Sequence, residues 1–323
     1  MDIKSPELQE RIAAAGSPET IERLDLSGLG IESLAGIEQL KNLRVLRVND
    51  NPLADLSPLA DLKKLTGLFA ARCGITSIDP LAALTTLPAL DLSGNPIADA
   101  GPLGAMRSLT WLDLSGCKVR DVSALEACRH LTELDLSRNP LASLDPVWTL
   151  PRLRIVRARA CRLHSTGTPR EGAVLSTLDL ADNHLTTIEP LVALYAAADF
   201  DLSANRLTSL KPLGGIEKVR TLNVSDNPLE SLDGVEQLNG LLIFYAWHTG
   251  ISDVTPLADL RKLRELGLAD NRITDITPLY GLTNLDLLFL GGNHGIPAEQ
   301  LEHMRMTAID DFRTPDWREE SSE

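Results

Sequence analysis

Cysteine and histidine are the side chains of this 323-residue sequence best suited to metal binding, redox chemistry or nucleophilic catalysis. There are four cysteines and six histidines: Cys73, Cys117, Cys128, Cys161, His130, His164, His184, His248, His294 and His303. The histidines form no HExxH or other ligand-spaced pair, and the sequence holds no GxSxG, no GxxxxGK(S/T) and no GxGxxG behind a lone strand. We therefore expect no metal, no cofactor and no catalytic residue.

A row of aspartates is the remaining candidate for chemistry. They stand in LDLS or related tetrapeptides and are separated by multiples of 22 residues: Asp25, Asp91, Asp113, Asp135, Asp179 and Asp201. Such a row could form an ion ladder or supply paired catalytic carboxylates, which keeps a carbohydrate-active or other enzyme as a remote alternative. The simpler interpretation is a recurrent strand sequence whose carboxylates face solvent, where their field favours a basic partner.

The 22-residue spacing extends through most of the chain. Aligned apolar residues recur at this interval without insertion or deletion: Ile21, Leu43, Leu65, Leu87, Leu109, Leu131, Leu153, Leu175, Ala197, Val219, Leu241, Leu263 and Leu285. Self-similarity at this period indicates a stack of like units rather than two globular domains. We predict a helical cap at 1–20, thirteen repeats at 21–306 and an acidic tail at 307–323.

The two end segments should cover the coil ends, because an open stack would otherwise expose apolar surface there. At the amino end we predict a helix whose buried stripe is Leu8, Ile12 and Ala15. At the other end residues 297–306 should cover the last coil through Leu301 and Met304, and Phe312 and Trp317 could attach the tail to it.

Each repeat is predicted to form one coil, with a strand on one side and a helical turn on the other. With Leu43 numbered as position 1, apolar residues recur at positions 1, 4, 6, 11, 14, 17 and 20. The spacing of positions 4 and 6 predicts a short strand, and the later three-residue spacings predict a 3₁₀-like turn. Position 16 is proline in eight repeats, and the Ser, Asp or Thr often before it should cap the turn.

Position 9 is asparagine in eight repeats: Asn51, Asn95, Asn139, Asn183, Asn205, Asn227, Asn271 and Asn293. An asparagine inside a sharp turn can bond backbone groups that no strand or helix satisfies, coil after coil. Cys73, Cys117 and Cys161 occupy the same position, and Cys128 occupies core position 20. We therefore interpret all four cysteines as small buried side chains rather than as ligands.

The pattern LxxLxLxxNxLxxLxPLxxL resembles the leucine-rich repeat family in its 22-residue class. Stretches such as LTELDLSRNPLASL and LRELGLADNRITDITPLYGL are similar to bacterial internalin-type repeats and to the repeats of a eukaryotic protein-phosphatase regulator. The resemblance implies an α/β leucine-rich-repeat solenoid, a right-handed curved superhelix of 13 coils. Its parallel sheet would line the concave face, and short 3₁₀ or helical turns the convex face. It also implies protein binding, without naming the partner.

Charge and hydropathy limit the class of partner and the cellular compartment that we expect for this protein. The chain has 31 basic and 45 acidic residues, and its net charge of −14 argues against a nucleic-acid partner. It has no run of 18 apolar residues and no basic start followed by an apolar run, so we expect neither a transmembrane segment nor the signal peptide that internalins carry. Isolated cysteines suit a reducing compartment. We expect a cytoplasmic, bacterial, monomeric protein.

Outward strand positions 3, 5 and 7 carry no core residue and are therefore available to a partner. Five of the twelve aromatic residues fall there, more than an even distribution would give: Phe69, Trp111, Tyr245, Trp247 and Phe289. Aromatic side chains are enriched in binding hot spots. We predict that these five residues contact a partner protein, chiefly in the carboxyl-terminal half of the face.

Repeats three, seven and eleven depart together from the consensus. Their strands read LFAARC, VRARAC and FYAWHT where others read LDLSGN. These coils add Arg72, Arg157, Arg159 and His248 to the predicted partner-binding residues. Their even spacing of 88 residues leaves duplication history alone as the alternative explanation.

Basic residues concentrate at positions 21, 22 and 2, which hold 13 of the 31: Lys41, Arg44, Lys63, Lys64, Arg107, Arg129, Arg152, Arg154, Lys218, Arg220, Arg261, Lys262 and Arg264. Basic groups complement the carbonyl ends of helical turns, which is the simpler explanation of this edge. A site for phosphate or anionic lipid is the alternative.

The function predicted from the sequence is a non-catalytic scaffold or inhibitor that binds another protein, of basic or mixed-charge surface, on its concave face. The alternatives are a regulatory subunit of a protein phosphatase, an immunity protein against a toxin, or an effector delivered to a host. All of these share one mechanism, recognition by the outward strand residues.

Overall fold

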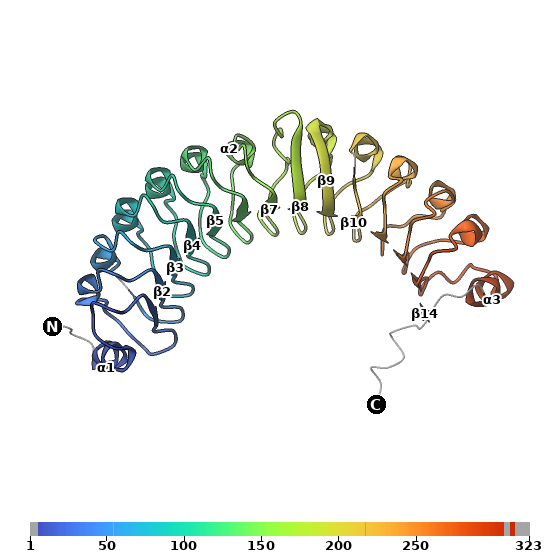
Figure 1. The fold of residues 1–323 in the computed structure, drawn as a ribbon. Coiled ribbons are helices and arrows are strands. Elements are labelled where there is room, and N and C mark those ends of the chain that lie inside the picture. The colour runs from blue at the N-terminus through green and yellow to red at the C-terminus, as the bar shows by residue number, and fades with distance from the viewer. Residues whose placement is uncertain (1–5, 54, 217, 307–310, 314–323) are drawn as a thin grey trace. The chain divides into compact units, whose positions relative to one another are not determined.

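The computed structural model describes residues 6–53, 55–216, 218–306 and 311–313. The chain divides into two compact units, Met1–Leu163 and His164–Glu323. Within each unit the strands lie along the concave side of the coil stack and the helical turns along the opposite side (Figure 1). Among the described residues, no helix has the length and apolar character needed to cross a membrane.

The first unit contains helix α1 (Pro6–Ala15), followed by seven strands and the helical turns between them. The strands are β1 (Arg23–Asp25), β2 (Val45–Arg47), β3 (Gly67–Phe69), β4 (Ala89–Asp91), β5 (Trp111–Asp113), β6 (Glu133–Asp135) and β7 (Ile155–Arg157). The turns are η1 (Ile37–Gln39), η2 (Ser57–Leu59), η3 (Asp79–Ala83), η4 (Gly101–Ala105), η5 (Ser123–Ala127) and the short helix α2 (Asp145–Trp148).

The second unit repeats this order and ends with a helix and a further strand. Its strands are β8 (Ala173–Asp179), β9 (Leu194–Asp201), β10 (Thr221–Asn223), β11 (Ile243–Tyr245), β12 (Glu265–Gly267), β13 (Leu287–Phe289) and β14 (Asp311–Arg313). Its turns are η6 (Glu189–Ala193), η7 (Lys211–Gly215), η8 (Val235–Gln237), η9 (Thr255–Leu257) and η10 (Thr277–Gly281), and helix α3 spans Ala298–Met306.

Strands in each unit pair in parallel, with the same repeat position opposite itself on the next coil. Leu112 of β5, for example, lies opposite Leu90 on one side and Leu134 on the other, and all three side chains are fully buried. Burial of a leucine side chain contributes about 1.5–3 kcal/mol relative to exposure. The fold class predicted from the sequence is confirmed: a parallel sheet of short strands with 3₁₀ turns on the other side.

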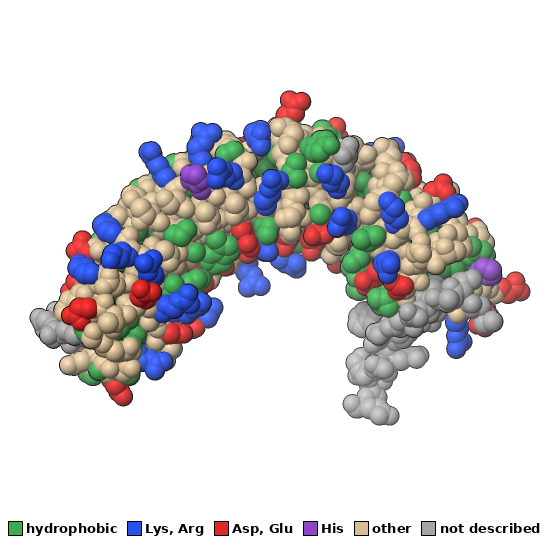
Figure 2. Space-filling view, viewed as in Figure 1, with side chains coloured by type: hydrophobic (Ala, Val, Ile, Leu, Met, Phe, Trp, Pro, Cys, Tyr) green, Lys and Arg blue, Asp and Glu red, His purple; other side chains and the backbone are tan. Residues whose placement is uncertain are grey.

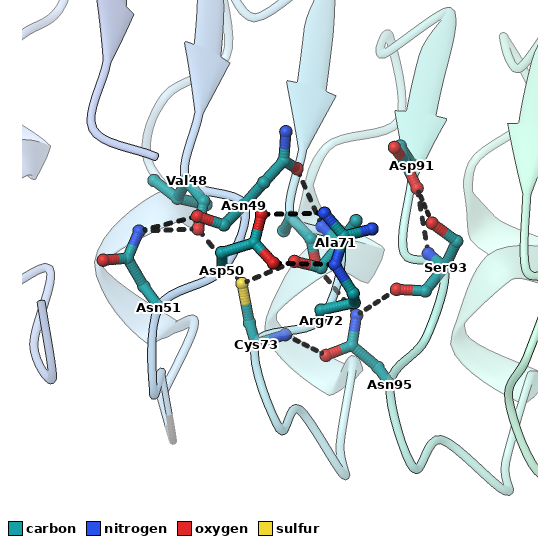
Figure 3. Close-up of polar contacts among 11 residues, drawn as sticks. Val48, Asn49, Asp50, Asn51, Ala71, Arg72, Cys73, Asp91, Ser93 and Asn95 are labelled. Carbon is teal, nitrogen blue, oxygen red and sulfur yellow. Dashed lines mark hydrogen bonds and ion pairs between the residues drawn. The ribbon is translucent and has the colours of Figure 1, made fainter. Parts of the chain in front are cut away.

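The asparagine at position 9 bonds the backbone of its own coil and of the coil before it. The Asn95 amide nitrogen donates to the carbonyls of Ala70 and Leu92, both at 2.8 Å. Its carbonyl oxygen accepts the backbone N–H groups of Cys73 at 2.9 Å and Ile75 at 3.0 Å (Figure 3). The side chain is 1% exposed, so these are groups that water cannot satisfy. The structural role predicted for this position is confirmed.

Cysteine at position 9 replaces part of that bonding. The Cys73 thiol donates to the carbonyls of Val48 at 3.1 Å and Ala71 at 3.3 Å (Figure 3). All four cysteines, those of position 9 and Cys128, are buried. Burial raises the pKa of Cys117 and of Cys128 to about 11. The prediction of small buried side chains is confirmed.

The helical turns are capped from position 13, whereas the sequence analysis placed the cap at position 15. The Asp121 carboxylate accepts the backbone N–H of Ser123, the first residue of η5, at 2.8 Å. In the same way the Ser77 hydroxyl accepts the N–H of Asp79, the first residue of η3, at 3.2 Å. The prediction was wrong because the residue at position 15 already belongs to the turn and its own N–H needs an acceptor.

The coil of repeat seven departs from the others. Its residues 164–172 form no helical turn, and β8 and β9 begin earlier than the other strands and pair over a longer stretch with one irregularity in register. Thr166 stands where other repeats carry an apolar residue, yet it is fully buried, and its hydroxyl donates to the Gly167 carbonyl at 2.9 Å. A satisfied hydroxyl therefore replaces an aliphatic side chain in this coil.

The described end segments contribute apolar side chains to the coil ends. Leu8 and Ile12 of α1 are buried, but Ala15 is exposed because the helix ends there and the chain turns at Gly16. Ala15 is therefore not part of the buried stripe predicted for this helix. In α3 Leu301 is half-buried. The backbone of β14 pairs with β13, whereas the predicted contact of the Phe312 side chain, and most of the acidic tail at 307–323, lie outside the described residues.

Candidate partner-binding surface

Two predicted aromatic residues of the first unit lie together on the strand face. The ring centroids of Phe69 on β3 and Trp111 on β5 are 6.2 Å apart. The guanidinium of Arg47 lies over the Phe69 ring, 4.3 Å from its centroid. The small residues Gly67 and Ala89 stand at position 3 of the two strands before Trp111, which leaves the rings room. Arg47 was not among the predicted site residues, although cation–π contact is a common role for arginine.

The predicted basic residues of the first unit are placed differently from one another. The Arg157 guanidinium is half-buried and pairs with the Glu133 carboxylate of the preceding strand at 2.6 Å. Arg159 is exposed. Arg72 stands in the turn beyond β3, where its guanidinium makes two 2.7 Å bonds to the Asp50 carboxylate of the previous coil (Figure 3). Only Arg157 and Arg159 therefore extend from a strand toward the open face.

The predicted aromatic residues of the second unit form a continuous cluster. Tyr245 and Trp247 meet edge to face with ring centroids 5.5 Å apart, and the Phe289 ring lies 5.9 Å from the Trp247 ring. The Tyr245 hydroxyl donates to the Glu265 carboxylate. Burial, then the Glu265 carboxylate, raises the pKa of Tyr245, so the phenol stays protonated. Trp247 keeps 41% of its surface exposed and is the most open member of the cluster.

Gly267 gives this cluster its shape. It lies on β12, directly opposite Tyr245 of β11 and Phe289 of β13. A Cβ atom built at Gly267 would collide with Nε1 of the Trp247 indole and with the Tyr245 ring. Because Gly267 has no side chain, the indole of Trp247 can extend into the space above it. Trp247 thereby reaches across one strand toward Phe289.

His248 lies at the turn edge beside the cluster. Its Nδ1 is 3.0 Å from a carboxylate oxygen of Asp226 in the previous coil, the same position-8 relationship as between Arg72 and Asp50. All position-8 residues have a positive φ, 51° at His248 and 53° at Arg72, a region that glycine, asparagine and aspartate favour. Because position 8 of every coil adopts this conformation, it is a feature of the repeat turn and does not single out His248 or Arg72.

A cleft opens at the same turn edge. It has a volume of about 910 Å³, and Trp247 forms part of its wall. His248, Asp270, Arg272 and His294 also line it. Volumes of about 300–1,000 Å³ are typical of ligand sites. Trp247 thus belongs both to the aromatic cluster and to the cleft.

The predicted row of aspartates is less exposed than the sequence analysis expected. Five of its members are half-buried and only Asp25 is exposed. Each carboxylate accepts the N–H two residues ahead, as Asp113 does from Ser115 at 2.7 Å. The expectation of solvated carboxylates was wrong because position 5 is needed to satisfy the backbone as it leaves the strand. Burial, with the like charges of Asp135 and Asp91 on the adjoining strands, raises the pKa of Asp113.

The basic edge carries ion pairs to the few acidic residues at the same positions. Arg44 lies 3.7 Å from Glu22, and Arg264 lies 3.2 Å from Asp286. Figure 2 shows Lys and Arg side chains spread along the coils, interspersed with Asp and Glu in the first unit. Exposed pairs of this kind contribute about 0–1 kcal/mol. The contact that fits the simpler explanation is a different one: Lys63 Nζ donates to the carbonyl of Ala83, the last residue of η3, at 2.7 Å.

The histidines do not assemble into a metal site in the described part of the chain. His164 and His184 meet edge to face with ring centroids 5.2 Å apart, and His303 stacks on Tyr280 with ring centroids 3.9 Å apart. No group of three or more His, Cys, Asp or Glu side chains in the described ranges could hold a metal ion. His130 beside Arg152 and His248 beside Asp226 likewise contact charged neighbours.

The structure thus groups the predicted residues into two sets and adds residues that the sequence analysis missed. Phe69 and Trp111 form one set, and Tyr245, Trp247, His248 and Phe289 the other. The missed residues are Arg47, Asp226, Glu265, Gly267 and Asp270. Gly267 could have been found by asking which outward neighbour of an aromatic side chain is small.

Comparison with known proteins agrees with this architecture. A family model of leucine-rich repeats in two copies matches residues 107–150 and 261–303, and a model of a single leucine-rich repeat matches residues 83–101. No curated protein matches the chain. The matched segments contain the buried strand and turn residues described above, so the similarity lies in the scaffold.

Solved structures with the same fold include bacterial proteins. An internalin from Listeria monocytogenes is 25% identical, with a TM-score of 0.64, over 98% of this chain and 92% of that chain. A leucine-rich repeat protein of Leptospira interrogans is 24% identical, with a TM-score of 0.81, over 94% of this chain and 80% of that one. The leucine-rich repeat fold is commonly a protein-interaction scaffold. By its repeats, its family models and its fold, the chain belongs to the leucine-rich repeat family.

Proposed function

We propose that this protein is a non-catalytic scaffold or inhibitor that binds a partner protein through the strand face of its second unit. Tyr245, Trp247, His248 and Phe289 are the proposed contact residues. The observation that carries the proposal is the aromatic cluster, whose three rings contact one another while Trp247 remains 41% exposed. A rigid aromatic patch offers a large contact area at little entropic cost, which is typical of hot spots.

The aromatic cluster has no role in the core of its own coil. Phe244 and Ala246 already fill the inward positions of β11 and are fully buried. Truncation of the outward rings should therefore leave the coil folded. This separation of core and surface on one strand makes the proposal testable by mutation.

The first unit is proposed to contribute secondary contacts. Phe69 and Trp111 offer a second aromatic pair, and Arg157 and Arg159 extend from the last strand of that unit. Arg72 is proposed as a peripheral contact, because its guanidinium is already paired with Asp50.

The proposed context is a monomer that acts in the cytoplasm of a bacterium. The four buried thiols support a reducing compartment. The proposed organisation keeps 1–20 and the segment around α3 as caps for thirteen repeats at 21–306, with Leu8 and Ile12 among the covering side chains.

In the test, the wild-type protein first captures a binding partner, which is then purified. The affinity of two double variants for that purified partner is compared with the affinity of the wild type. Tyr245→Ala with Trp247→Ala should weaken binding by at least about 2 kcal/mol, roughly 30-fold. Val192→Ala with Tyr195→Ala is the matched control, because it removes side chains that are 50% and 51% exposed elsewhere in the same unit. Both variants should keep the melting temperature of the wild type. Equal affinity of the two double variants would contradict the proposal.

A further inference from the structure

The strand face of the second unit differs in charge from that of the first. Positions 3, 5 and 7 of repeats eight to thirteen include no lysine or arginine, and their charged residues are Asp179, Asp199, Asp201 and Glu265. The same positions of the first unit include Arg23, Arg47, Arg157 and Arg159. On its strands a partner of the second unit therefore meets aromatic rings with Glu265 beside them, aspartates two or more strands away and no basic side chain, and charge complementarity favours a basic partner.

Within the cleft, one carboxylate is available to such a partner. Asp226 is engaged by His248, whereas no basic side chain of the described residues forms an ion pair with Asp270. Asp270 is half-buried and lines the cleft together with the Trp247 indole. Gly292, the next position-8 residue, leaves the space that the Asp270 carboxylate occupies, since a Cβ atom there would collide with it.

An aromatic face and a carboxylate in one cleft are complementary to a guanidinium. Arginine stacks its planar group on an indole and bonds a carboxylate through two N–H groups at once, which the point charge of lysine does not do. Two further lining residues, Arg272 and His294, are exposed and have donors suited to the main-chain carbonyls of a bound segment. Both features fit a short chain segment better than an isolated ion.

We propose that the cleft between Trp247 and Asp270 binds an arginine side chain of the partner protein. The inference rests on the proposed function and names the chemistry of its partner: a basic protein that inserts an arginine beside the aromatic cluster. Trp247 stacks on the guanidinium and Asp270 pairs with it, while Tyr245 and Phe289 hold the indole in place.

The test titrates the full chain with Nα-acetyl-arginine amide as the probe. Binding is observed as a change in the NMR signals of the tryptophan indole N–H groups. The Trp247 signal is assigned by its loss in Trp247→Phe. We expect a saturable shift of that signal with the arginine probe and none with the neutral isostere Nα-acetyl-citrulline amide. The lysine analogue should bind more weakly. Trp111 and Trp148, both in the first unit, should not respond.

Asp270→Asn should weaken binding of the probe about tenfold, because the charge-assisted bonds are lost. Asp182→Asn is the matched control, since Asp182 has the same turn position and a φ of 56°, as Asp270 does, but is not in the lining of the cleft. The control should bind as the wild type does. An equal response to citrulline, unaltered binding by Asp270→Asn, or equal shifts at Trp111 would each overturn the arginine site.

Failure of this inference differs from failure of the proposed function. If a partner still requires Tyr245 and Trp247 but Trp247 ignores the arginine probe, the binding function stands and the arginine site falls. If the probe binds but a partner is indifferent to the Tyr245→Ala and Trp247→Ala double variant, the arginine site stands and the proposed function falls.

Discussion

The indole of Trp247 extends over the backbone of Gly267 on the neighbouring strand, in the space where any other residue would place a Cβ atom. The contact joins Tyr245 on one side and Phe289 on the other into one aromatic surface. The position of the most exposed ring in the cluster is therefore set by a residue that has no side chain.

Gly267→Ala should displace the Trp247 indole without unfolding the coil. Its φ is not in the left-handed region, so alanine fits the backbone, and replacing glycine inside a strand removes an entropic cost of about 0.5–1 kcal/mol. We expect the melting temperature to stay or rise, while partner affinity falls and the near-ultraviolet circular dichroism of the tryptophans changes.

Gly281→Ala is the control for this substitution. A Cβ atom at Gly281 would meet only the Ala258 carbonyl, at an ordinary 3.7 Å, on the side of the coil away from the strands. It should change neither the spectrum nor the affinity. A Gly267→Ala variant with wild-type affinity would show that the position of the indole is unimportant for binding.

The aromatic members of the site could be predicted from the sequence, but their arrangement could not. Counting repeat positions places Tyr245, Trp247 and Phe289 outward because positions 4 and 6 must be inward. The role of Gly267 depends on which rotamer the indole of a different strand adopts, and repeat position does not specify a rotamer. The carboxylate of Asp270 could not be singled out for a similar reason, since Asp50 and Asp226 occupy the same repeat position and are paired with basic side chains.

Asn139→Ala should destabilise the first unit by about 1–3 kcal/mol, because buried backbone groups lose their partners. The Asn139 amide donates to the carbonyls of Leu114 and Leu136, and its oxygen accepts the N–H of Val119. Urea unfolding followed by circular dichroism measures the loss. Asn239→Ala is the control, because Asn239 is exposed and its amide donates to a single nearby carbonyl. Equal stability of the two variants would contradict the role of Asn139 in bonding the buried backbone groups of adjacent coils.

Cys117→Asn should be tolerated or stabilising, by up to about 1 kcal/mol. The new amide would recreate the bonds of the other position-9 residues, including an acceptor for the Ile97 N–H, as Asn139 provides for Val119. Cys128→Asn is the opposite case, since position 20 lies in the apolar core and an amide there should cost about 2 kcal/mol. Thermal unfolding of both variants measures their stabilities relative to the wild type. A destabilised Cys117→Asn variant would contradict the prediction that asparagine is tolerated at position 9.

The regular coils were predictable because one period imposes the same burial on every repeat, and the ladder of Asn95 repeats wherever position 9 is asparagine. The sequence predicted the wrong capping position for the helical turns because Asp121 and Ser123 are both good capping residues by type. Only the point at which the backbone enters the 3₁₀ turn decides between them. The lengthening of β8 and β9 follows the loss of a helical turn in repeat seven, where no periodic signal remains to be read.

Asp113→Asn should stabilise the protein at neutral pH and not in acid. The pKa of Asp113 is raised by burial first, with the neighbouring Asp135 and Asp91 adding to it, so the folded state holds the proton more tightly than the unfolded state does. Stability from this group is therefore present at low pH and is lost as the pH rises from the ordinary aspartate pKa of 3.8 through the folded-state pKa.

Asparagine removes that charge and keeps the hydrogen bond, because its oxygen can accept the Ser115 N–H just as Asn223 accepts the N–H of Ser225 at the same repeat position. Relief of one like-charged neighbour across a strand pair is worth about 0.5 kcal/mol. We expect a gain of that order at pH 7 in urea unfolding, and the gain should vanish at pH values well below 3.8, where the carboxyl is protonated in both the folded and the unfolded state.

Asp121→Asn is the control of opposite sign. Its carboxylate is exposed, and the hydrogen bonds from the backbone and then the hydroxyl of Ser123 hold its pKa below the ordinary value, so its charged form favours the folded state. Stability from Asp121 is present above the unfolded-state pKa and is lost as the pH falls through the folded-state pKa. Asp121→Asn should therefore bring no gain at pH 7. If the two variants shift stability in the same direction at pH 7, charge repulsion is not the cause, and the row on β4, β5 and β6 must be held together by the turn hydrogen bonds alone.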